Sequence, residues 1–250
     1  MHRFFLPPEQ CQETTVFLAG REAHHARHVL RMRPGEPVTV LDGAGGELIC
    51  EVQDPERDRV PLLVRQRNSL PAPSFQITLL QALPKGKIIE AIIQKATELG
   101  VHRVAPLLSK RVSTRLDPTS AAQKVEKWRG VAIEAIKQCG SAWLPKIEPP
   151  LTPGDFLARH EKFDLPLIAS LQPGSRHARE YFRQFQATHQ RMPGSVCVWV
   201  GPEGDFAPAE VAAIQSAGAL PITLGRLVLR AETAAVYCLS ILNYELESAS

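Results

Sequence analysis

From residue 73 onward, short β-prone apolar runs alternate with longer stretches whose apolar residues recur at helical spacing. Strands separated by helices, with apolar residues on both faces, are typical of a mainly parallel sheet covered on both sides. The expected strands lie at 75–83, 101–108, 164–170, 195–200 and 219–224. The expected helices lie at 85–100, 123–139, 176–190, 208–218 and 232–246. We therefore predict an α/β fold for this part of the chain.

The segment before residue 70 has a different pattern. Short alternating strands flank the turn-forming DGAGG at 42–46, another strand is expected at 59–67, and a helix is expected at 21–32. The composition changes at LPAPSF, residues 70–75. We predict a small β-rich domain over residues 1–70 and a larger α/β domain over residues 73–250.

Length and composition restrict the class of protein. A chain of 250 residues that is 44% hydrophobic can bury a substantial core. We expect no membrane span, because no apolar run approaches about eighteen residues, and no signal peptide at the start of the sequence. The five cysteines are far apart and form no CxxC pair. They are typical of buried thiols in a reducing compartment, so we expect a soluble cytoplasmic protein without disulfides.

The positive charge is concentrated in one part of the chain. The formal net charge is only +3, but residues 80–130 hold ten Lys and Arg against four Asp and Glu. A concentrated basic surface favours a polyanionic partner. A basic surface that is simply solvated would look similar, and this pattern alone does not separate the two.

Three expected strands end in unusual loops, within residues 167–174, 198–206 and 222–234. In parallel sheets, ligands bind at the carboxyl ends of the strands. No GxGxxG follows the first strand, which argues against a nicotinamide enzyme. The loop GPEGDF is not a phosphate loop either, because no Lys-Ser or Lys-Thr follows and Glu203 with Asp205 would repel a phosphate. We expect a neutral or cationic ligand, such as a nucleoside that carries a sulfonium; a simple tight turn is the alternative.

Four motifs in order resemble a known family. HHARHVLR (24–31), KATELGV (95–101), GPEGDF (201–206) and LGRLVLRAETA (224–234) are similar to those of the bacterial methyltransferases that modify N3 of a uridine in 16S ribosomal RNA. These enzymes belong to the knotted SPOUT class. The resemblance implies a trefoil knot that binds S-adenosylmethionine, a homodimer, and an N-terminal PUA-like β-barrel for RNA. It implies 16S RNA or the small ribosomal subunit as the substrate.

The resemblance also assigns cofactor-binding residues within the three loops. They are Leu171, Val200, Gly201, Pro202, Glu203, Gly204, Leu224, Gly225, Leu229, Arg230 and Thr233. The sequence departs from the family at Asp205, where relatives often have glycine, and at Ala231, where they often have threonine. An arginine that is often found near residues 138–143 is also absent here.

To methylate N3 of uridine, an enzyme must do two things. The base must be aligned with the methyl donor, and the negative charge that develops on the uracil oxygens must be stabilised as the N3 proton leaves. We assign the cationic role to Arg230 and name Glu232 as a candidate proton acceptor. The alternative is that Arg230 and Glu232 form a structural pair at the start of the last helix.

Phosphate contacts are expected from basic residues of both predicted domains. They are Arg3, Arg31, Arg33, Lys85, Lys87, Lys95, Lys110, Arg111 and Arg115. His24 and His28 have the spacing of a metal-binding helix, but no third ligand is apparent, and we expect no metal. Two other functions stay open at this point. A non-catalytic ribosome-assembly factor would need the basic surface but not the three loops, and an oxidoreductase would need the missing glycine motif.

Overall fold

The structure is a computed structural model that describes residues 1–56, 58–86, 88–111, 118–172 and 174–247. Its internal contacts divide the chain into two compact units. One unit comprises Met1–Ala72 with Ile133–Leu144, and the other comprises Pro73–Ala132 with Pro145–Ser250. The domain boundary predicted near residue 70 coincides with the end of the segment Met1–Ala72. The sequence did not predict that residues 133–144 belong to the first unit.

The first unit is built on a curled five-stranded sheet in the order β1-β3-β4-β5-β2. Its strands are β1 (His2–Phe5), β2 (Thr15–Ala19), β3 (Pro37–Leu41), β4 (Gly46–Val52) and β5 (Arg59–Ser69). Only the β1–β3 pair is parallel, and the ladder between β4 and β5 shifts register between Ile49 and Cys50. Such an irregularity bends the strand and increases its twist, which helps the sheet to curl around its core. The small β-rich unit was predicted, although strands β1 and β2 were not.

Helical turns complete this unit. A 3-10 turn, η1 (Pro8–Gln10), precedes β2. The helix expected at 21–32 forms as α1 (Gly20–His24), which continues into a π-helical turn, η2 (His25–Val29). Ala23 and Ala26 face the sheet and join a core that includes Phe4, Leu18 and Leu62.

Residues 140–144 pack on the DGAGG turn of the first unit. The backbone N–H of Leu144 donates to Gly43 O at 2.9 Å, and that of Gly45 donates to Ala142 O at 3.0 Å. A Cβ atom on Gly45 would lie 2.5 Å from the ring of Trp143, so a glycine is required where this aromatic side chain packs. The turn therefore joins β3 to β4 and also holds a distant part of the sequence.

The second unit contains a six-stranded sheet in which every ladder is parallel, in the order β11-β9-β10-β6-β7-β8. The strands are β6 (Gln76–Ala82), β7 (Arg103–Leu107), β8 (Lys146–Ile147), β9 (Leu165–Ala169), β10 (Ser195–Val200) and β11 (Leu220–Ile222). The helices are α2 (Ile88–Glu98), α3 (Pro118–Cys139), α4 (Pro153–Leu157), α5 (Ala178–His189), α6 (Pro208–Ser216) and α7 (Ala231–Glu247). Strands and helices alternate as predicted, which confirms the α/β fold.

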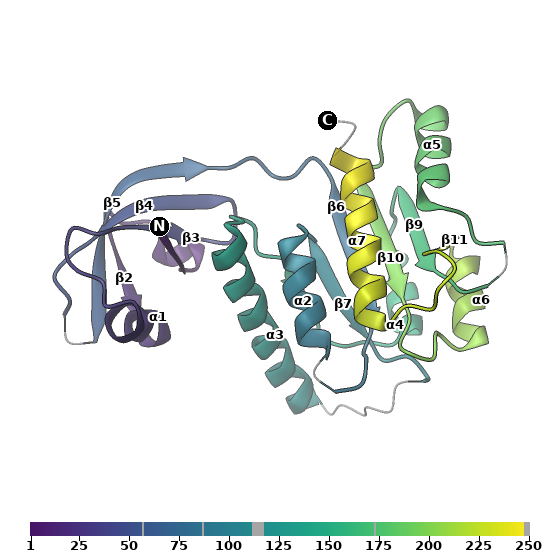
Figure 1. The fold of residues 1–250 in the computed structure, drawn as a ribbon, viewed down its shortest axis with the longest axis horizontal. Helices are drawn as coiled ribbons and strands as arrows, with labels where there is room; N and C mark the ends of the chain where they lie inside the picture. Colours follow the sequence, from purple (N-terminus) through teal and green to yellow (C-terminus); the bar gives the residue numbers. More distant parts are fainter. Residues whose placement is uncertain (57, 87, 112–117, 173, 248–250) are drawn as a thin grey trace. The chain divides into compact units, whose positions relative to one another are not determined.

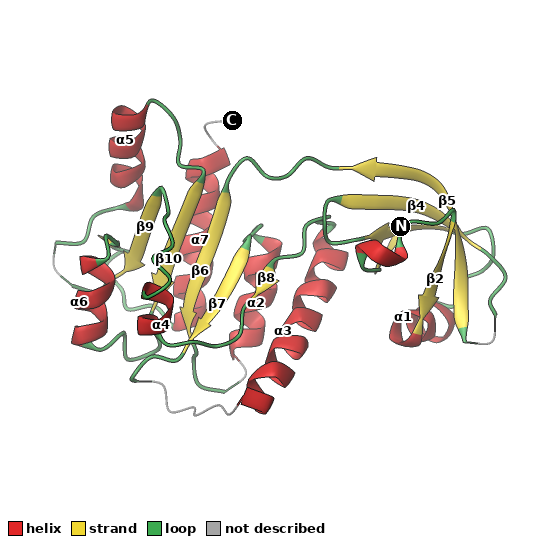
Figure 2. Ribbon diagram, turned by 180° about the vertical axis from the view of Figure 1, so that it is seen from behind, coloured by secondary structure: helices red, strands yellow, loops and turns green. Residues whose placement is uncertain are grey.

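Helices cover both faces of this sheet. Helices α2 and α7 pack together on one face, where α7 contacts β6 and β10, while α4 and α6 pack on the other (Figures 1 and 2). The core on the α4 and α6 face includes Leu80, Trp199, Phe206 and Ile214. Trp128 of α3 is also buried, as expected of an aromatic residue on an apolar helical stripe.

Strand β11 is threaded between two parts of the chain. On one edge it pairs with β9, and Ser170 N donates to Ile222 O at 3.0 Å. On its other edge Ile222 forms a parallel bridge with Arg176, and Thr223 N donates to Arg176 O at 2.9 Å. Strand β11 therefore lies between β9 and the stretch at Arg176 that leads into α5, before the chain continues into α7. This is the threading expected of the trefoil knot, which ordinary doubly wound sheets lack.

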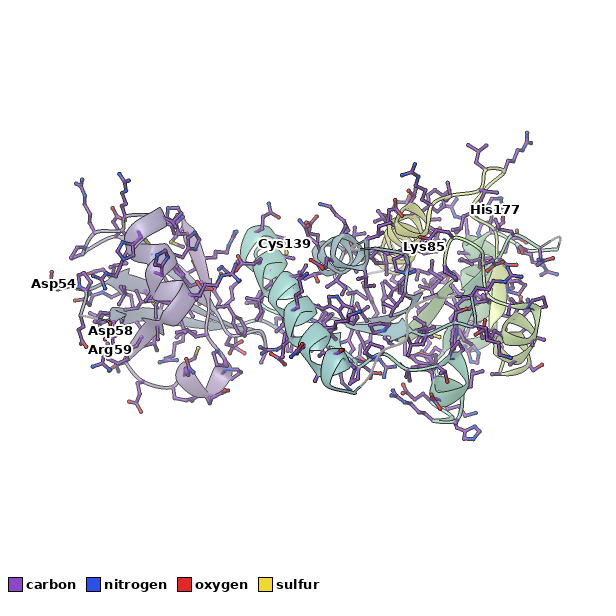
Figure 3. The ribbon with its side chains drawn as sticks, turned by 90° about the horizontal axis from the view of Figure 1, so that it is seen from below. Asp54, Asp58, Arg59, Lys85, Cys139 and His177 are labelled. Carbon is purple, nitrogen blue, oxygen red and sulfur yellow. The ribbon has the colours of Figure 1, made fainter. Side chains whose placement is uncertain are left out.

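The cysteines are free thiols, of which Cys139 at the end of α3 is the exposed one (Figure 3). Burial raises the pKa of the Cys238 thiol to about 12, so this group stays protonated at neutral pH. In the part of the chain that the structure describes, no helix has both the length and the apolar character needed to cross a membrane.

Candidate functional site

A cavity of about 390 Å³ lies at the carboxyl ends of β9, β10 and β11. Its walls come from the segments that follow these three strands and from the start of α7. The sequence marked the same three loops as unusual, and the fold brings them together because parallel strands end at one edge of the sheet.

Most of the expected cofactor-binding residues line this cavity. Those that do are Leu171, Val200, Gly201, Pro202, Glu203, Leu224, Gly225 and Leu229. Gly204, Arg230 and Thr233 do not line it. The walls also contain residues of the three marked loops that the resemblance did not assign one by one, namely Ala169, Ser170, Gln172, Gly174, Asp205, Thr223, Arg226, Leu227, Val228, Ala231 and Ala234, and they contain Ser175, which lies just beyond the first loop and was missed. Because all of them belong to the same loops or to the start of α7, contiguity along the sequence was the available signal.

The loop after β10 is a tight turn. The backbone N–H of Asp205 donates to Pro202 O at 2.8 Å, and Asp205 has a φ of 62°. Its carboxylate accepts a hydrogen bond of 2.7 Å from the N–H of Phe206. A Cβ atom on Gly201 would lie 2.8 Å from that carboxylate oxygen and 3.1 Å from the N atom of Phe206, so a larger residue at 201 would displace the carboxylate and crowd the turn.

Segments that follow two neighbouring strands hold this turn from outside. The Glu203 carboxylate accepts a hydrogen bond of 3.2 Å from the N–H of Lys85, which follows β6. The Arg111 guanidinium, which follows β7, donates to the carbonyl oxygen of Gly204. Since β10, β6 and β7 are neighbours in the sheet, these contacts keep the turn against the carboxyl edge.

The cavity wall combines carboxylates with apolar side chains. Glu203 and Asp205 line it together with Leu171, Leu227 and Val228, which are 60%, 77% and 75% exposed. Carboxylates beside apolar groups suit a ligand with both a positive charge and a flat apolar part. Among the described residues, no cluster of three or more His, Cys, Asp or Glu could hold a metal ion.

Arg230 and Glu232 lie where the loop after β11 enters α7. Arg230 is exposed, and its carbonyl oxygen accepts the N–H of Ala234 at 2.8 Å, in the first turn of the helix. Within the described ranges, no ion pair joins Arg230 to Glu232. The structural pair considered above as an alternative role for these two residues is therefore not formed.

The expected RNA contacts have different environments. Arg3 donates to the carbonyl oxygens of Lys137 and Gln138 at the end of α3, and Lys95 forms an ion pair of 2.8 Å with Glu98. Arg3 and Lys95 are both exposed, as are the other described residues of this set: Arg31, Arg33, Lys85, Lys110 and Arg111. Lys87 and Arg115 lie outside the described residues. His24 and His28 have ring centroids 4.7 Å apart and form a histidine pair on the helix surface.

Comparison with known proteins gives matches over nearly the whole chain. Residues 71–243 match the family model described as RNA methyltransferase domain, and residues 18–63 match the model described as RNA methyltransferase PUA domain. A Synechocystis protein named Ribosomal RNA small subunit methyltransferase E is 35% identical over 250 residues, which cover 99% of this chain and 78% of that protein. A Bacillus subtilis protein of the same name is 32% identical and covers 99% and 98%.

Solved structures of similar proteins share the fold. A putative methyltransferase from Legionella pneumophila, solved with its bound cofactor SAM, is 30% identical with a TM-score of 0.87, over 97% of this chain and 96% of that one. A Ribosomal RNA small subunit methyltransferase E from Neisseria gonorrhoeae, bound to S-adenosylmethionine, is 28% identical with a TM-score of 0.83, again over 97% and 96%.

Proposed function

Because the chain belongs to the RNA methyltransferase family that includes ribosomal RNA small subunit methyltransferase E, we propose that it methylates N3 of a uridine in 16S ribosomal RNA with S-adenosylmethionine as the donor. The observation that carries this proposal is the cavity formed by three strand-end loops at the threaded edge of the sheet. Relatives with the same fold hold S-adenosylmethionine.

The residues of the cavity fit this cofactor. The carboxylates of Glu203 and Asp205 suit a sulfonium, and Gly201, which lines the cavity, lets the turn that carries these carboxylates close tightly. Gly225 has a φ of 106°, which favours glycine in the loop whose backbone would face the adenine. When bound, S-adenosylmethionine supplies an electrophilic methyl group. Gly204, Arg230 and Thr233, which do not line the cavity, remain proposed as cofactor neighbours from the family resemblance.

We assign the chemistry of the target base to the start of α7. The Arg230 side chain would stabilise the negative charge on the uracil oxygens, and the Glu232 carboxylate would accept the N3 proton. Both residues adjoin Leu229 and Ala231, which line the cavity. The absence of an ion pair between the two side chains, within the described residues, leaves both available to the base.

The Arg230 assignment has a direct test. Replacement of Arg230 by Ala should lower the single-turnover methylation rate by roughly 100-fold, which is the typical effect of removing one charge-stabilising donor. Affinity for S-adenosylmethionine, measured by calorimetry, should change little. Arg183→Ala, which removes an exposed arginine from α5, is the control and should leave the rate unchanged. A rate for Arg230→Ala within a few fold of wild type would remove the catalytic assignment.

The first unit, with its PUA match, is proposed to bind RNA, and the second to carry out methyl transfer. We keep residues 1–70 as the proposed RNA-binding domain and residues 73–250 as the proposed methyltransferase domain. Residues 133–144, which belong to the first compact unit, are added to the RNA-binding part. Arg31, Arg33, Lys85 and Lys110 are exposed, and their side chains can reach phosphates without breaking any hydrogen bond or ion pair described for the site. Arg3, Lys95 and Arg111 would have to share their present partners.

A second copy of the chain is proposed to cover the exposed apolar residues near the cavity. Leu227 and Val228 lie in the loop before α7, and Tyr237 and Tyr244 lie one above the other on its exposed face. The proposed ribosomal substrate and the free thiols support a cytoplasmic location.

Two measurements test the proposed function. Calorimetry should detect binding of S-adenosylmethionine to the purified chain. Mass spectrometry of small-subunit RNA from a deletion strain should show loss of a single N3-methyluridine, which the purified protein restores. Binding to small subunits without cofactor binding or methylation would instead support a non-catalytic assembly factor.

A further inference from the structure

Glu210 is a buried carboxylate outside the cavity, with only 8% of the residue exposed. It is the third residue of α6 and accepts a hydrogen bond of 2.9 Å from the N–H of Ala207, the residue that precedes the helix. It also accepts hydrogen bonds of 2.9 Å from the Ser109 hydroxyl and from the N–H of Lys110. The first contact closes the start of a helix, but the other two come from a segment about one hundred residues earlier in the chain.

The burial of this carboxylate requires those partners. A buried charge is costly unless hydrogen bonds satisfy it, and three donors surround Glu210. Both oxygens are used, since one accepts from Lys110 and the other from Ser109 and Ala207. The start of α6 is therefore fixed against the segment that follows β7.

The turn at residues 201–206, here called the cofactor turn, leads directly into the start of α6. Residues 201–206 line or adjoin the cavity and end one residue before Ala207. A second contact joins the same two segments, because the Arg111 guanidinium donates to Gly204 O while the N–H of Arg111 donates to the Ser109 hydroxyl at 3.4 Å. The basic residues Lys110 and Arg111 and the cofactor turn thus share one hydrogen-bonded unit.

We propose that Glu210 is a positioning residue for methyl transfer. It ties the cofactor turn to the basic segment Ser109–Arg111, so that a bound methyl donor and an RNA phosphate held at Lys110 and Arg111 share one fixed geometry. This inference rests on the proposed function. A misplacement of about 1 Å between reacting groups can lower a rate by about 100-fold, so the loss of this tie should affect the rate more than the affinity for the cofactor.

The chain offers a matched control. Glu180 occupies the same position in α5. Within the described residues, its carboxylate accepts one hydrogen bond, of 3.4 Å, from the N–H of the nearby His177 (Figure 3). Glu180 is exposed, and this hydrogen bond joins no second segment of the chain. Glu180→Gln therefore measures the effect of weakening a helix cap alone.

The test compares the full-length wild type with Glu210→Gln, Ser109→Ala and Glu180→Gln. Small ribosomal subunits from a deletion strain are methylated in a single turnover at saturating S-adenosylmethionine, and cofactor affinity and melting temperature are measured without RNA. We expect the Glu210→Gln rate to fall at least about 10-fold, with cofactor affinity within about 3-fold of wild type. Ser109→Ala, which keeps the carboxylate and removes one donor, should give a smaller loss in the same direction, and Glu180→Gln should leave the rate unchanged.

Three outcomes would overturn the inference. They are a Glu210→Gln rate near that of wild type, a cofactor affinity that falls in proportion to the rate, and an equal loss in Glu180→Gln. If Glu210→Gln does not fold, Ser109→Ala decides by the same criteria. A wild-type protein that does not methylate the subunits contradicts the proposed function, whereas an active wild type with an equally active variant contradicts only the role of Glu210.

Discussion

At the scale of single residues, the two glycines of GPEGDF have different roles. A Cβ atom on Gly201 would lie 2.8 Å from the Asp205 carboxylate and 3.1 Å from its Cα atom. A Cβ atom on Gly204 would lie 3.7 Å from the Arg111 side chain, which is an ordinary contact, and neither glycine has a positive φ. Glycine is therefore favoured at 201 for steric reasons, whereas position 204 has no steric need for glycine.

This difference predicts opposite results for two similar substitutions. Gly201→Ala should open the turn and weaken binding of S-adenosylmethionine by at least about 10-fold, a loss of about 1.4 kcal/mol. Gly204→Ala should leave the affinity within about 3-fold, since its added methyl group meets no obstacle. Calorimetric titration of both variants is the measurement. Equal affinities for the two variants would show that the close approach at Gly201 does not shape the cofactor site.

At the scale of elements, Asp164 joins β9 to the segment that leads into β10. Its carboxylate accepts two hydrogen bonds of 2.9 Å from the Arg191 guanidinium and one of 2.7 Å from the N–H of Gly194. Hydrogen bonds from Arg191, followed by that from Gly194, lower the pKa of Asp164 to about 2, although partial burial opposes the shift. The carboxylate therefore holds two neighbouring strands in register at the edge of the sheet opposite the cavity.

The lowered pKa predicts a dependence of stability on pH. The unfolded carboxyl group has a pKa of about 3.9, so its contribution is fully present above that pH and is lost as the pH falls toward 2. Asp164→Asn should lower the free energy of unfolding by about 1–2 kcal/mol at pH 7, a figure reduced because Arg191 is half exposed. In urea unfolding, the difference between wild type and variant should shrink between pH 4 and pH 3. A difference that stays constant over this range would contradict the assignment.

The sequence predicted long elements well and short or distant ones poorly. Helix α7 and strand β10 were predictable because their apolar pattern persists over many residues. Strand β8 has two residues and α4 has five, too few for a period to emerge. The position of β11 depends on a bridge between Arg176 and Ile222, and the local spacing of apolar residues does not predict a pairing between such distant residues. The three loops were recognised as one site, whereas the contacts of Glu210 required coordinates.

At the scale of the whole molecule, the exposed apolar residues are unevenly distributed. Leu171, Leu227 and Val228 line the cavity and are more than half exposed, and Tyr237 and Tyr244 extend the apolar surface along α7. Large exposed apolar patches are rare on monomeric proteins, and where they occur they mark interaction or ligand-binding sites. Since three of these residues are also cavity walls, a partner that covers them would complete the cofactor site.

This arrangement predicts that assembly and cofactor binding are lost together. The wild type should have twice the mass of one chain by light scattering, and Tyr237→Glu should have the mass of one chain, because a charge at the centre of a largely apolar interface is costly. Affinity for S-adenosylmethionine should then fall by at least about 10-fold, although residue 237 does not line the cavity. Gln123→Glu, which adds a charge to an exposed position of α3, should preserve both mass and affinity. A monomeric Tyr237→Glu variant with full affinity would show that one chain holds the cofactor alone.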